Sequence, residues 1–291
     1  MKVSGLEPGI YFNLPSSIYH ADPALSRSDI VALAPPEGTG FTYWEKSWMN
    51  SNRKPPKPPS EEMAFGEAFH CQMFEPDRFE RDYFVFTVDQ WDYGKTMIAK
   101  EDYDNIVSAI KVLRSGKDSK LFLSGGLPEV TIVFDEFGHR FRTRHDLLTP
   151  VVTTDFKTTF SLAPWHLKKA FDKYGYDVQM YLYKRARERF KEQFLAGEAH
   201  VFGQVDEKFF ESFLYSNVND FVFIFQRQTP PFPFEPLLPE DDTEDSGAEK
   251  VRDALVVYEK NMKKYGTSKP WEVSDGKLKR FSMKYGIVQE N

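Results

Sequence analysis

Hydrophobic and polar positions alternate with a period of two through the middle of the chain, and this alternation predicts β-strands rather than helices. The runs 129–134 and 140–146 flank a short turn that contains glycine, so we expect a β-hairpin there. A third strand over 151–157 follows a short loop, and further strand-like runs cover 199–205 and 221–225. The pattern therefore predicts a β-sheet that includes this hairpin.

The hairpin sorts its residues onto two faces. If it turns at residues 137–138, antiparallel partners have residue numbers that add to 275, and Glu129 lies directly opposite Asp146. These two carboxylates share a polar face with Thr131, Val133, Arg142 and Arg144. The other face is apolar enough to meet the core, and it carries Val130, Ile132, Phe134, Phe141, Thr143 and His145.

Helical periodicity and capping residues predict helices before and after these strands. Ser60 is a suitable N-cap for a helix that runs to about residue 74. Two helices follow the third strand, over 163–173 and 176–196. Further helical stretches lie at 26–33 and 246–264. Together these elements predict an α/β fold, with a central mixed β-sheet flanked by α-helices.

Changes in composition divide the chain into three parts. Residues 1–59 form an N-terminal extension that ends in a basic, proline-rich connector, which is extended because proline lacks a backbone donor and restricts the residue before it. Residues 60–235 hold the core. Residues 236–291 are interpreted as an acidic linker at 240–245, a C-terminal helix and a tail, packed on the same domain.

Charge and composition exclude several classes of protein. The 291 residues include 38 Lys and Arg against 44 Asp and Glu, so a formal net charge of −6 does not suit nucleic-acid binding by bulk charge. We find no apolar run of about eighteen residues for a transmembrane helix, and no secretory signal. The single cysteine, Cys71, excludes internal disulfides and four-cysteine metal sites. We therefore expect a cytoplasmic protein, and we attribute the 16% aromatic content to core packing.

Carboxylates placed opposite each other repel, so a cation is expected between Glu129 and Asp146. In the third strand, Asp155 and Lys157 are two residues apart and share a face. If that strand lies beside the second, all four residues converge. Carboxylates with a lysine nearby suit Mg²⁺ or Mn²⁺ rather than zinc. Such a site supports phosphodiester hydrolysis, in which the metal acidifies a water that the lysine orients. Taken singly, each residue is also an ordinary strand-end or surface residue.

Four motifs stand in order along the chain. They are Gly66-x-x-x-His70, Arg144-His145-Asp146, Asp155-Phe156-Lys157-Thr158-Thr159, and Gln179-x-x-x-Tyr183 preceded by Tyr174-Gly175-Tyr176. Together they resemble the PD-(D/E)XK nuclease superfamily, and within it the exonuclease VIII (RecE-type) and phage-exonuclease branch. The motifs span residues 66–183. One departure is His145, where relatives often have proline.

The resemblance implies a role for each motif residue. Asp146 and Asp155 are implied metal ligands, and Lys157 is the implied catalytic lysine. His70 is implied as an additional residue at the metal, and Glu129 has the position of a supporting acid. The implied cofactor is Mg²⁺, with Mn²⁺ as its substitute.

Several other residues are candidates for support or for DNA contact. Gln179 and Tyr183 lie four apart on one helix and could support the lysine or touch a strand, although ordinary helix surface is the alternative. Phosphate contacts are assigned to Arg144, Lys168 and Lys169. Further basic candidates are Arg142, Lys173, Lys184, Arg185, Arg187, Arg189 and the connector residues Arg53, Lys54 and Lys57.

We therefore expect a metal-dependent exonuclease that hydrolyses linear double-stranded DNA and yields single strands for recombination, with 5′→3′ polarity implied by the resemblance. Two alternatives remain open: a single-strand or structure-specific endonuclease of the same fold, and a non-catalytic nucleic-acid-binding protein with a degenerate site. The resemblance further implies a single-strand annealing protein as partner, a ring-shaped homo-oligomer, and a bacterial or phage-infected host cell. No membrane partner is expected.

Overall fold

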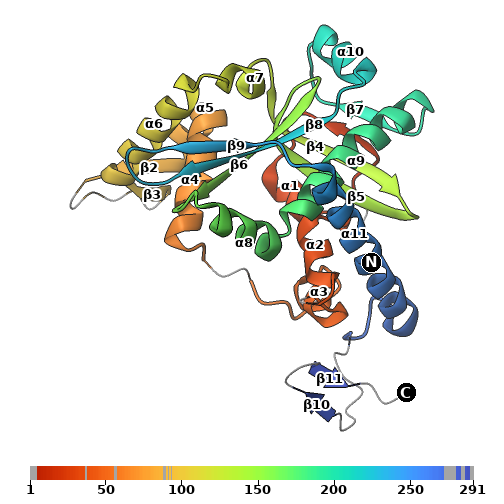
Figure 1. Ribbon diagram of the computed structural model, residues 1–291. Coiled ribbons are helices and arrows are strands. Elements are labelled where there is room, and N and C mark those ends of the chain that lie inside the picture. The colour runs from red at the N-terminus through yellow and green to blue at the C-terminus, as the bar shows by residue number, and fades with distance from the viewer. Residues whose placement is uncertain are drawn as a thin grey trace.

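A seven-stranded mixed β-sheet, in the order β7-β1-β4-β5-β6-β8-β9, forms the centre of the protein (Figure 1). The computed structural model describes residues 5–36, 38–55, 58–87, 90, 92 and 94–271, and the backbone of 280–282 and 286–288. The strands of the sheet are β1 (Gly9–Tyr11), β4 (Leu127–Glu136), β5 (His139–Leu148), β6 (Val152–Thr159), β7 (His200–Phe202), β8 (Asp220–Arg227) and β9 (Phe234–Leu237). Two small sheets pair β2 (Tyr83–Phe86) with β3 (Thr96–Ala99), and β10 (Arg280–Ser282) with β11 (Gly286–Val288).

Helices cover both faces of the sheet (Figure 1). Their bounds are α1 (Ser16–Ala21), α2 (Arg27–Leu33), α3 (Gly40–Lys46), α4 (Glu61–Phe74), α5 (Pro76–Asp82), α6 (Lys100–Ser115), α7 (Ser119–Leu123), α8 (Pro164–Tyr174), α9 (Tyr176–Leu195), α10 (Glu207–Tyr215) and α11 (Asp241–Tyr265). The predicted α/β architecture, a central mixed sheet flanked by helices, is confirmed. Within the described part of the chain, none of the helices combines the length and apolar character needed to span a bilayer.

The hairpin has the predicted register. Its pairs run from Leu127↔Leu148 to Glu136↔His139, and the residue numbers in each pair add to 275. Phe137 and Gly138 form the turn with φ values of 50° and 75°, the left-handed backbone of a tight two-residue hairpin loop. The pairing skips Glu129 and Asp146, the pair predicted to lie directly opposite each other, and Glu129 has a φ of 52°. The two residues still lie between the paired positions on either side.

Side chains of each strand alternate between two buried cores. Phe221, Phe223 and Phe225 of β8 lie in the core that contains α9, while Ile224 between them lies in the core that contains α4. A strand covered by helices on both faces needs apolar residues in both positions. The high aromatic content therefore fills these two layers, as the sequence predicts.

The N-terminal residues cover the hairpin's polar face, which the sequence alone would leave open. Arg142 is 8% exposed and donates to the backbone carbonyl of Asp22. The guanidinium of Arg142 also lies over the Tyr19 ring, 5.1 Å from its centroid. Alternation separated the two faces correctly, but the polar face is buried because residues far away in sequence satisfy its charges.

The acidic run at 240–245 is a second difference. It was interpreted as a linker, whereas α11 begins at Asp241 with Glu240 as its N-cap residue. Carboxylates stabilise the first turn of a helix because they face its unpaired backbone N–H groups. The run therefore starts the helix instead of preceding it. Lys57 of the predicted connector lies outside the described residues.

The packing of α11 against α9 depends on Gly247. A Cβ added there would lie 2.3 Å from the backbone carbonyl oxygen of Asp177. We expect Gly247→Ala to lower the free energy of unfolding by about 1–3 kcal/mol, as overpacking of a close contact does. Urea denaturation measures this change. The matched control is Glu249→Ala on the exposed side of the same helix, expected within about 0.5 kcal/mol of wild type. An equal loss in both variants would contradict the packing argument.

Candidate active site

The site lies where β5 and β6 separate. The two strands pair at Leu147↔Thr154 and Leu148↔Thr153. Further along, the Asp146 side chain replaces the backbone partner, because its Oδ2 accepts a hydrogen bond of 2.8 Å from the backbone N–H of Phe156. A carboxylate is thereby fixed between two strands at the centre of the sheet.

Three potential metal ligands meet at this point. One ligand atom each from His70, Glu129 and Asp146 lies within 4.8 Å of the others. Trans ligands of one octahedral Mg²⁺ are about 4.2 Å apart, given bonds of about 2.1 Å, so the cluster needs little adjustment to hold such an ion. Two carboxylates and one imidazole are donors that Mg²⁺ and Mn²⁺ accept. The donor set therefore fits a divalent metal.

His70 reaches the cluster from α4, which closely approaches β6. Its Nε2 lies 2.9 Å from the carbonyl oxygen of Phe156 and 3.7 Å from Oδ2 of Asp146. One turn earlier, a Cβ at Gly66 would lie 3.0 Å from Oγ1 of Thr158, tighter than an ordinary contact. The Gly-x-x-x-His spacing thus lets the helix approach the strand and directs the imidazole toward its backbone.

Glu129 is held by its backbone and by a cation. Its φ of 52° is unusual for a residue other than glycine, and such strain is most often retained where function requires it. Its carboxylate is paired with Nε of Arg144, and Nη2 of Arg144 donates to the carbonyl of Leu14 at 3.1 Å. Arg144 therefore positions the acid instead of presenting a free cation.

Asp155 and Lys157 share one face of β6, as the alternation predicts. The Asp155 carboxylate is fully buried, paired with the Lys157 ammonium, and accepts a hydrogen bond from the side-chain amide of Gln179 on α9. Lys157 also lies 5.3 Å from the centroid of the Tyr176 ring. Gln179 therefore contacts Asp155 directly and Lys157 only through it. Tyr176 belongs to the Tyr174-Gly175-Tyr176 motif, but sequence reasoning assigned it no role.

The four residues predicted to converge lie in two adjoining groups: Glu129 and Asp146 with His70, and Asp155 with Lys157. Asp155 lies outside the cluster of His70, Glu129 and Asp146, because strand alternation turns it toward α9 while His70 approaches from α4. The two parts still interact electrostatically. The pKa of the Asp146 carboxyl is raised to about 7, first by burial and then by the Asp155 charge, against the opposing effects of His70 and Lys157. Protons and metal therefore compete for Asp146.

His145 and Tyr183 lie beneath this site as buried supports. The two ring nitrogens of His145 face the hydroxyls of Thr143 and Thr153 at 3.2 and 3.1 Å, and its ring centroid lies 4.7 Å from that of Tyr183. Burial and the nearby Arg187 guanidinium lower the pKa of His145, so the imidazole is neutral. Tyr183, a candidate for strand contact, is 7% exposed and instead packs in the core.

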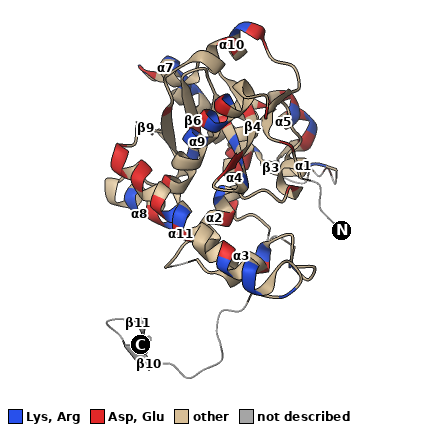
Figure 2. Ribbon diagram, turned by 90° about the vertical axis from the view of Figure 1, so that its right-hand side faces the viewer, with Lys and Arg blue, Asp and Glu red and all other residues tan. Residues whose placement is uncertain are grey.

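Most basic candidates for DNA contact are already paired. On α9, Lys184 pairs with Glu244, and Arg185 and Arg189 both pair with Glu136. Arg187 is fully buried and donates to the backbone carbonyls of the 149–150 loop. Figure 2 shows basic and acidic segments interleaved along the helices. Partners distant in sequence therefore neutralise these cations of α9 and leave them less available to a DNA phosphate.

Lys168 and Lys169 remain exposed on α8, which directly follows β6. Lys168 lines a cavity that also contains Asp172 and Asp177. Lys169 lies 5.2 Å from the centroid of the Trp165 ring. The two adjacent lysines therefore occupy different surroundings.

Comparisons with known proteins support the fold. Residues 37–203, more than half of the chain, match the family model described as "PDDEXK-like domain of unknown function (DUF3799)". The fold is similar to a crystal structure from Eubacterium rectale described as a "Putative exonuclease", with a TM-score of 0.57, 15% sequence identity, and coverage of 86% of this chain and 88% of that chain. No curated protein sequence matches. At this identity the structural likeness shows the fold alone, and the matched family supports a nuclease.

The raised pKa of Asp146 predicts that this residue destabilises the metal-free protein at high pH. A carboxyl with a pKa of about 7 in the folded state and 3.8 ordinarily keeps a proton that the unfolded chain releases. The contribution of Asp146 to the free energy of unfolding should therefore fall as pH rises from about 4 to about 7. Asp146→Asn cannot ionise, so we expect it to be more stable than wild type at pH 8, by at most about 4 kcal/mol at 1.4 kcal/mol per pKa unit, and equal at pH 4.

Urea denaturation in EDTA at both pH values measures this difference. Asp253→Asn, an exposed substitution on α11, is the control and should track wild type at both. If Asp146→Asn is no more stable than wild type at pH 8, the ionised Asp146 carboxylate does not lower the free energy of unfolding as expected.

Proposed function

The chain belongs to the family of PDDEXK-like domains of unknown function, and from that premise we propose that it is a Mg²⁺-dependent exodeoxyribonuclease acting on linear double-stranded DNA. The observation that carries the proposal is the position of Lys157 and Asp155 beside the cluster of His70, Glu129 and Asp146. A lysine next to clustered metal ligands suits metal-assisted phosphodiester hydrolysis, because it adds a positive charge beside the activated water and the phosphate.

We assign the metal to Asp146, Asp155, Glu129 and His70. His70, Glu129 and Asp146 already converge, and Asp155 lies on the neighbouring strand. When bound, a divalent ion supplies neutralisation of phosphate charge and acidification of a water. The donors are fixed before the ion arrives, since Arg144 holds Glu129 and the Phe156 backbone holds Asp146.

Lys157 is assigned to the attacking water and to the charge that develops on the phosphate. Its ammonium is largely buried between the Asp155 carboxylate and the Tyr176 ring, so it cannot move freely. Gln179 acts through Asp155, because it donates to the oxygen that Lys157 does not hold. Restriction of this kind favours catalysis, since the charge is in place before the transition state forms.

The finer assignments rest on the sequence motifs. We propose membership of the RecE-type and phage-exonuclease branch, with 5′→3′ polarity and a role in producing single strands for recombination. A single-strand annealing partner and a ring-shaped homo-oligomer follow from the same resemblance. The alternatives are an endonuclease of the same fold and a non-catalytic DNA-binding protein.

Replacing Lys157 with Ala separates chemistry from metal binding. We expect Mg²⁺-dependent digestion of duplex DNA to slow by about 10²- to 10⁴-fold, because a positioned proton-transfer and charge-stabilising group is lost. Binding of Mn²⁺, followed by calorimetry, should persist in this variant and be lost in Asp146→Ala. Asp155→Ala should abolish hydrolysis. The control is Lys208→Ala, an exposed lysine on α10, which should digest like wild type. Undiminished digestion by Lys157→Ala would refute the assignment.

The requirement for a DNA end distinguishes the proposed activity from its alternatives. We expect end-labelled linear duplex to be degraded progressively, and covalently closed circular duplex to remain intact under the same conditions. Release of a 5′ label before a 3′ label would agree with the proposed polarity. Cleavage of the circle would favour an endonuclease, and inactivity on both substrates despite Mn²⁺ binding would favour a binding protein.

A further inference from the structure

Helix α8 and the loop before it expose a set of aromatic side chains. Phe160 is 65% exposed and Trp165 is 64% exposed. His166 joins them, since its ring centroid lies 4.5 Å from that of Phe160 and 5.7 Å from that of Trp165. Single exposed aromatic residues are common, but contiguous ones on a soluble protein usually mark a contact surface.

Lysines lie on the same side of the helix. Trp165, Lys169 and Lys173 follow a spacing of four, which places them along one stripe about 12 Å long at 1.5 Å per residue. Lys169 lies 5.2 Å from the Trp165 ring centroid, and Lys173 lies 5.0 Å from that of Tyr174. Among the described residues, no carboxylate forms an ion pair with Lys169 or Lys173, unlike Lys157, Lys184 and Lys250. The stripe therefore presents aromatic faces next to unneutralised charge.

The stripe is next to the proposed catalytic lysine. Phe160 is three residues beyond Lys157, about 10 Å along an extended chain at 3.3 Å per residue. At its other end, α8 leads directly into Tyr176 and Gln179, which contact Lys157 and Asp155. Both ends of the segment 160–174 are therefore close in sequence to residues of the proposed active site.

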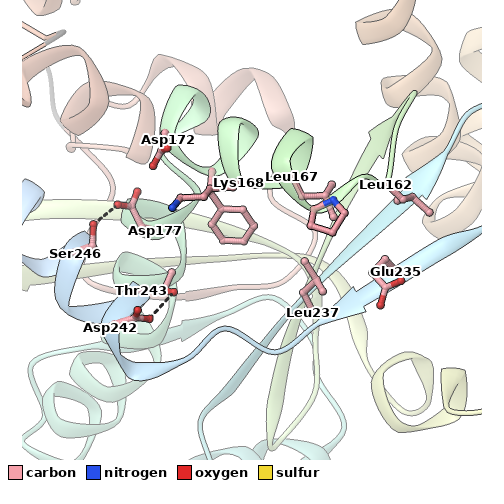
Figure 3. A pocket seen from close by; sticks show the side chains of 12 residues that line it. Leu162, Leu167, Lys168, Asp172, Asp177, Glu235, Leu237, Asp242, Thr243 and Ser246 are labelled. Carbon is pink, nitrogen blue, oxygen red and sulfur yellow. Dashed lines mark hydrogen bonds between the residues drawn. The ribbon is translucent and has the colours of Figure 1, made fainter.

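An acidic cavity borders the other flank of α8. It has a volume of about 680 Å³, and its lining includes Asp172, Asp177, Glu235 and Asp242 (Figure 3). Lys168 is part of this lining (Figure 3). Asp177 is paired with Lys250, whereas Asp172, Glu235 and Asp242 have no ion-pair partner among the described residues. These three carboxylates repel a phosphate backbone, so a nucleic acid on α8 is directed away from the cavity and toward Trp165 and Lys169.

We propose that Phe160 and Trp165 form a stacking platform for bases of single-stranded DNA, with Lys169 and Lys173 contacting its phosphates. The inference rests on the proposed nuclease function, which supplies the strand that leaves or enters the active site. Stacking accepts any base and suits a nuclease without sequence preference. Internal base pairs of double-stranded DNA cannot use the platform, since both faces of each pair are already stacked.

Binding to a labelled single strand in EDTA tests the platform without hydrolysis. The probe is a fluorescein-labelled oligothymidylate of about twelve nucleotides, within the range that such grooves bind, measured by anisotropy. We expect Trp165→Ala and Phe160→Ala each to weaken binding about tenfold, the loss of one stacked base. Trp165→Phe keeps a ring and should retain most of the affinity. Tyr215→Ala, a 69% exposed aromatic on α10 at the opposite end of the molecule, is the control and should bind like wild type (Figure 1).

An abasic strand of equal length separates stacking from charge. Wild type should bind it about a hundredfold more weakly than oligothymidylate, since both stacked bases are lost, and Trp165→Ala should bind the abasic strand no more weakly than wild type does. Equal loss on both strands, or unchanged binding by Trp165→Ala, would overturn the platform. If Trp165→Ala instead changes the sedimentation of the protein and not its affinity for DNA, the surface is a protein contact and the proposal is wrong.

The outcome is separable from that of the proposed function. Wild type that digests duplex DNA while Trp165→Ala binds oligothymidylate normally would refute the platform and leave the nuclease. If wild type digests no DNA but binds oligothymidylate more tightly than Trp165→Ala does, the nuclease proposal is refuted and the platform is supported.

Discussion

The structure depends on one hydrogen bond in which a side chain takes the place of the backbone. The Asp146 carboxylate accepts from the backbone N–H of Phe156, where a backbone carbonyl of β5 would accept in a regular strand pair. This contact separates the two strands while keeping both in the sheet. The separation admits the His70 imidazole from α4 on one side and leaves Asp155 and Lys157 facing α9 on the other. A charge at the centre of a sheet is unfavourable unless it is compensated. The Asp146 position is therefore suited to a cation and unsuited to an apolar core.

The local parts of this arrangement were predictable from the sequence because they follow from strand geometry. A period of two and a two-residue turn fix the hairpin register, and with it the position of Glu129 beside Asp146. The same alternation places Asp155 and Lys157 on one face. The helix that carries His70 begins where Ser60 caps it, since the Ser60 hydroxyl accepts from the backbone of Met63.

The remaining features depend on contacts between residues far apart in the sequence, and no local pattern encodes them. Arg144 was assigned to DNA but pairs with Glu129 and reaches the carbonyl of Leu14. The cations of α9 are neutralised by Glu136 on β4 and by Glu244 on α11. A basic residue can be located from the sequence, whereas its freedom to bind phosphate is decided by tertiary structure.

The contacts from Leu14 through Arg144 to Glu129 connect the N-terminal residues to the proposed metal cluster. They join a carbonyl in the first twenty residues to an acid in the metal cluster, although the matched family region begins at residue 37. A residue that precedes the matched region thus helps to hold an acid of the proposed metal cluster. Because Arg144 contacts a backbone carbonyl, this anchor depends on the path of the chain at Leu14 and not on the identity of the side chain there.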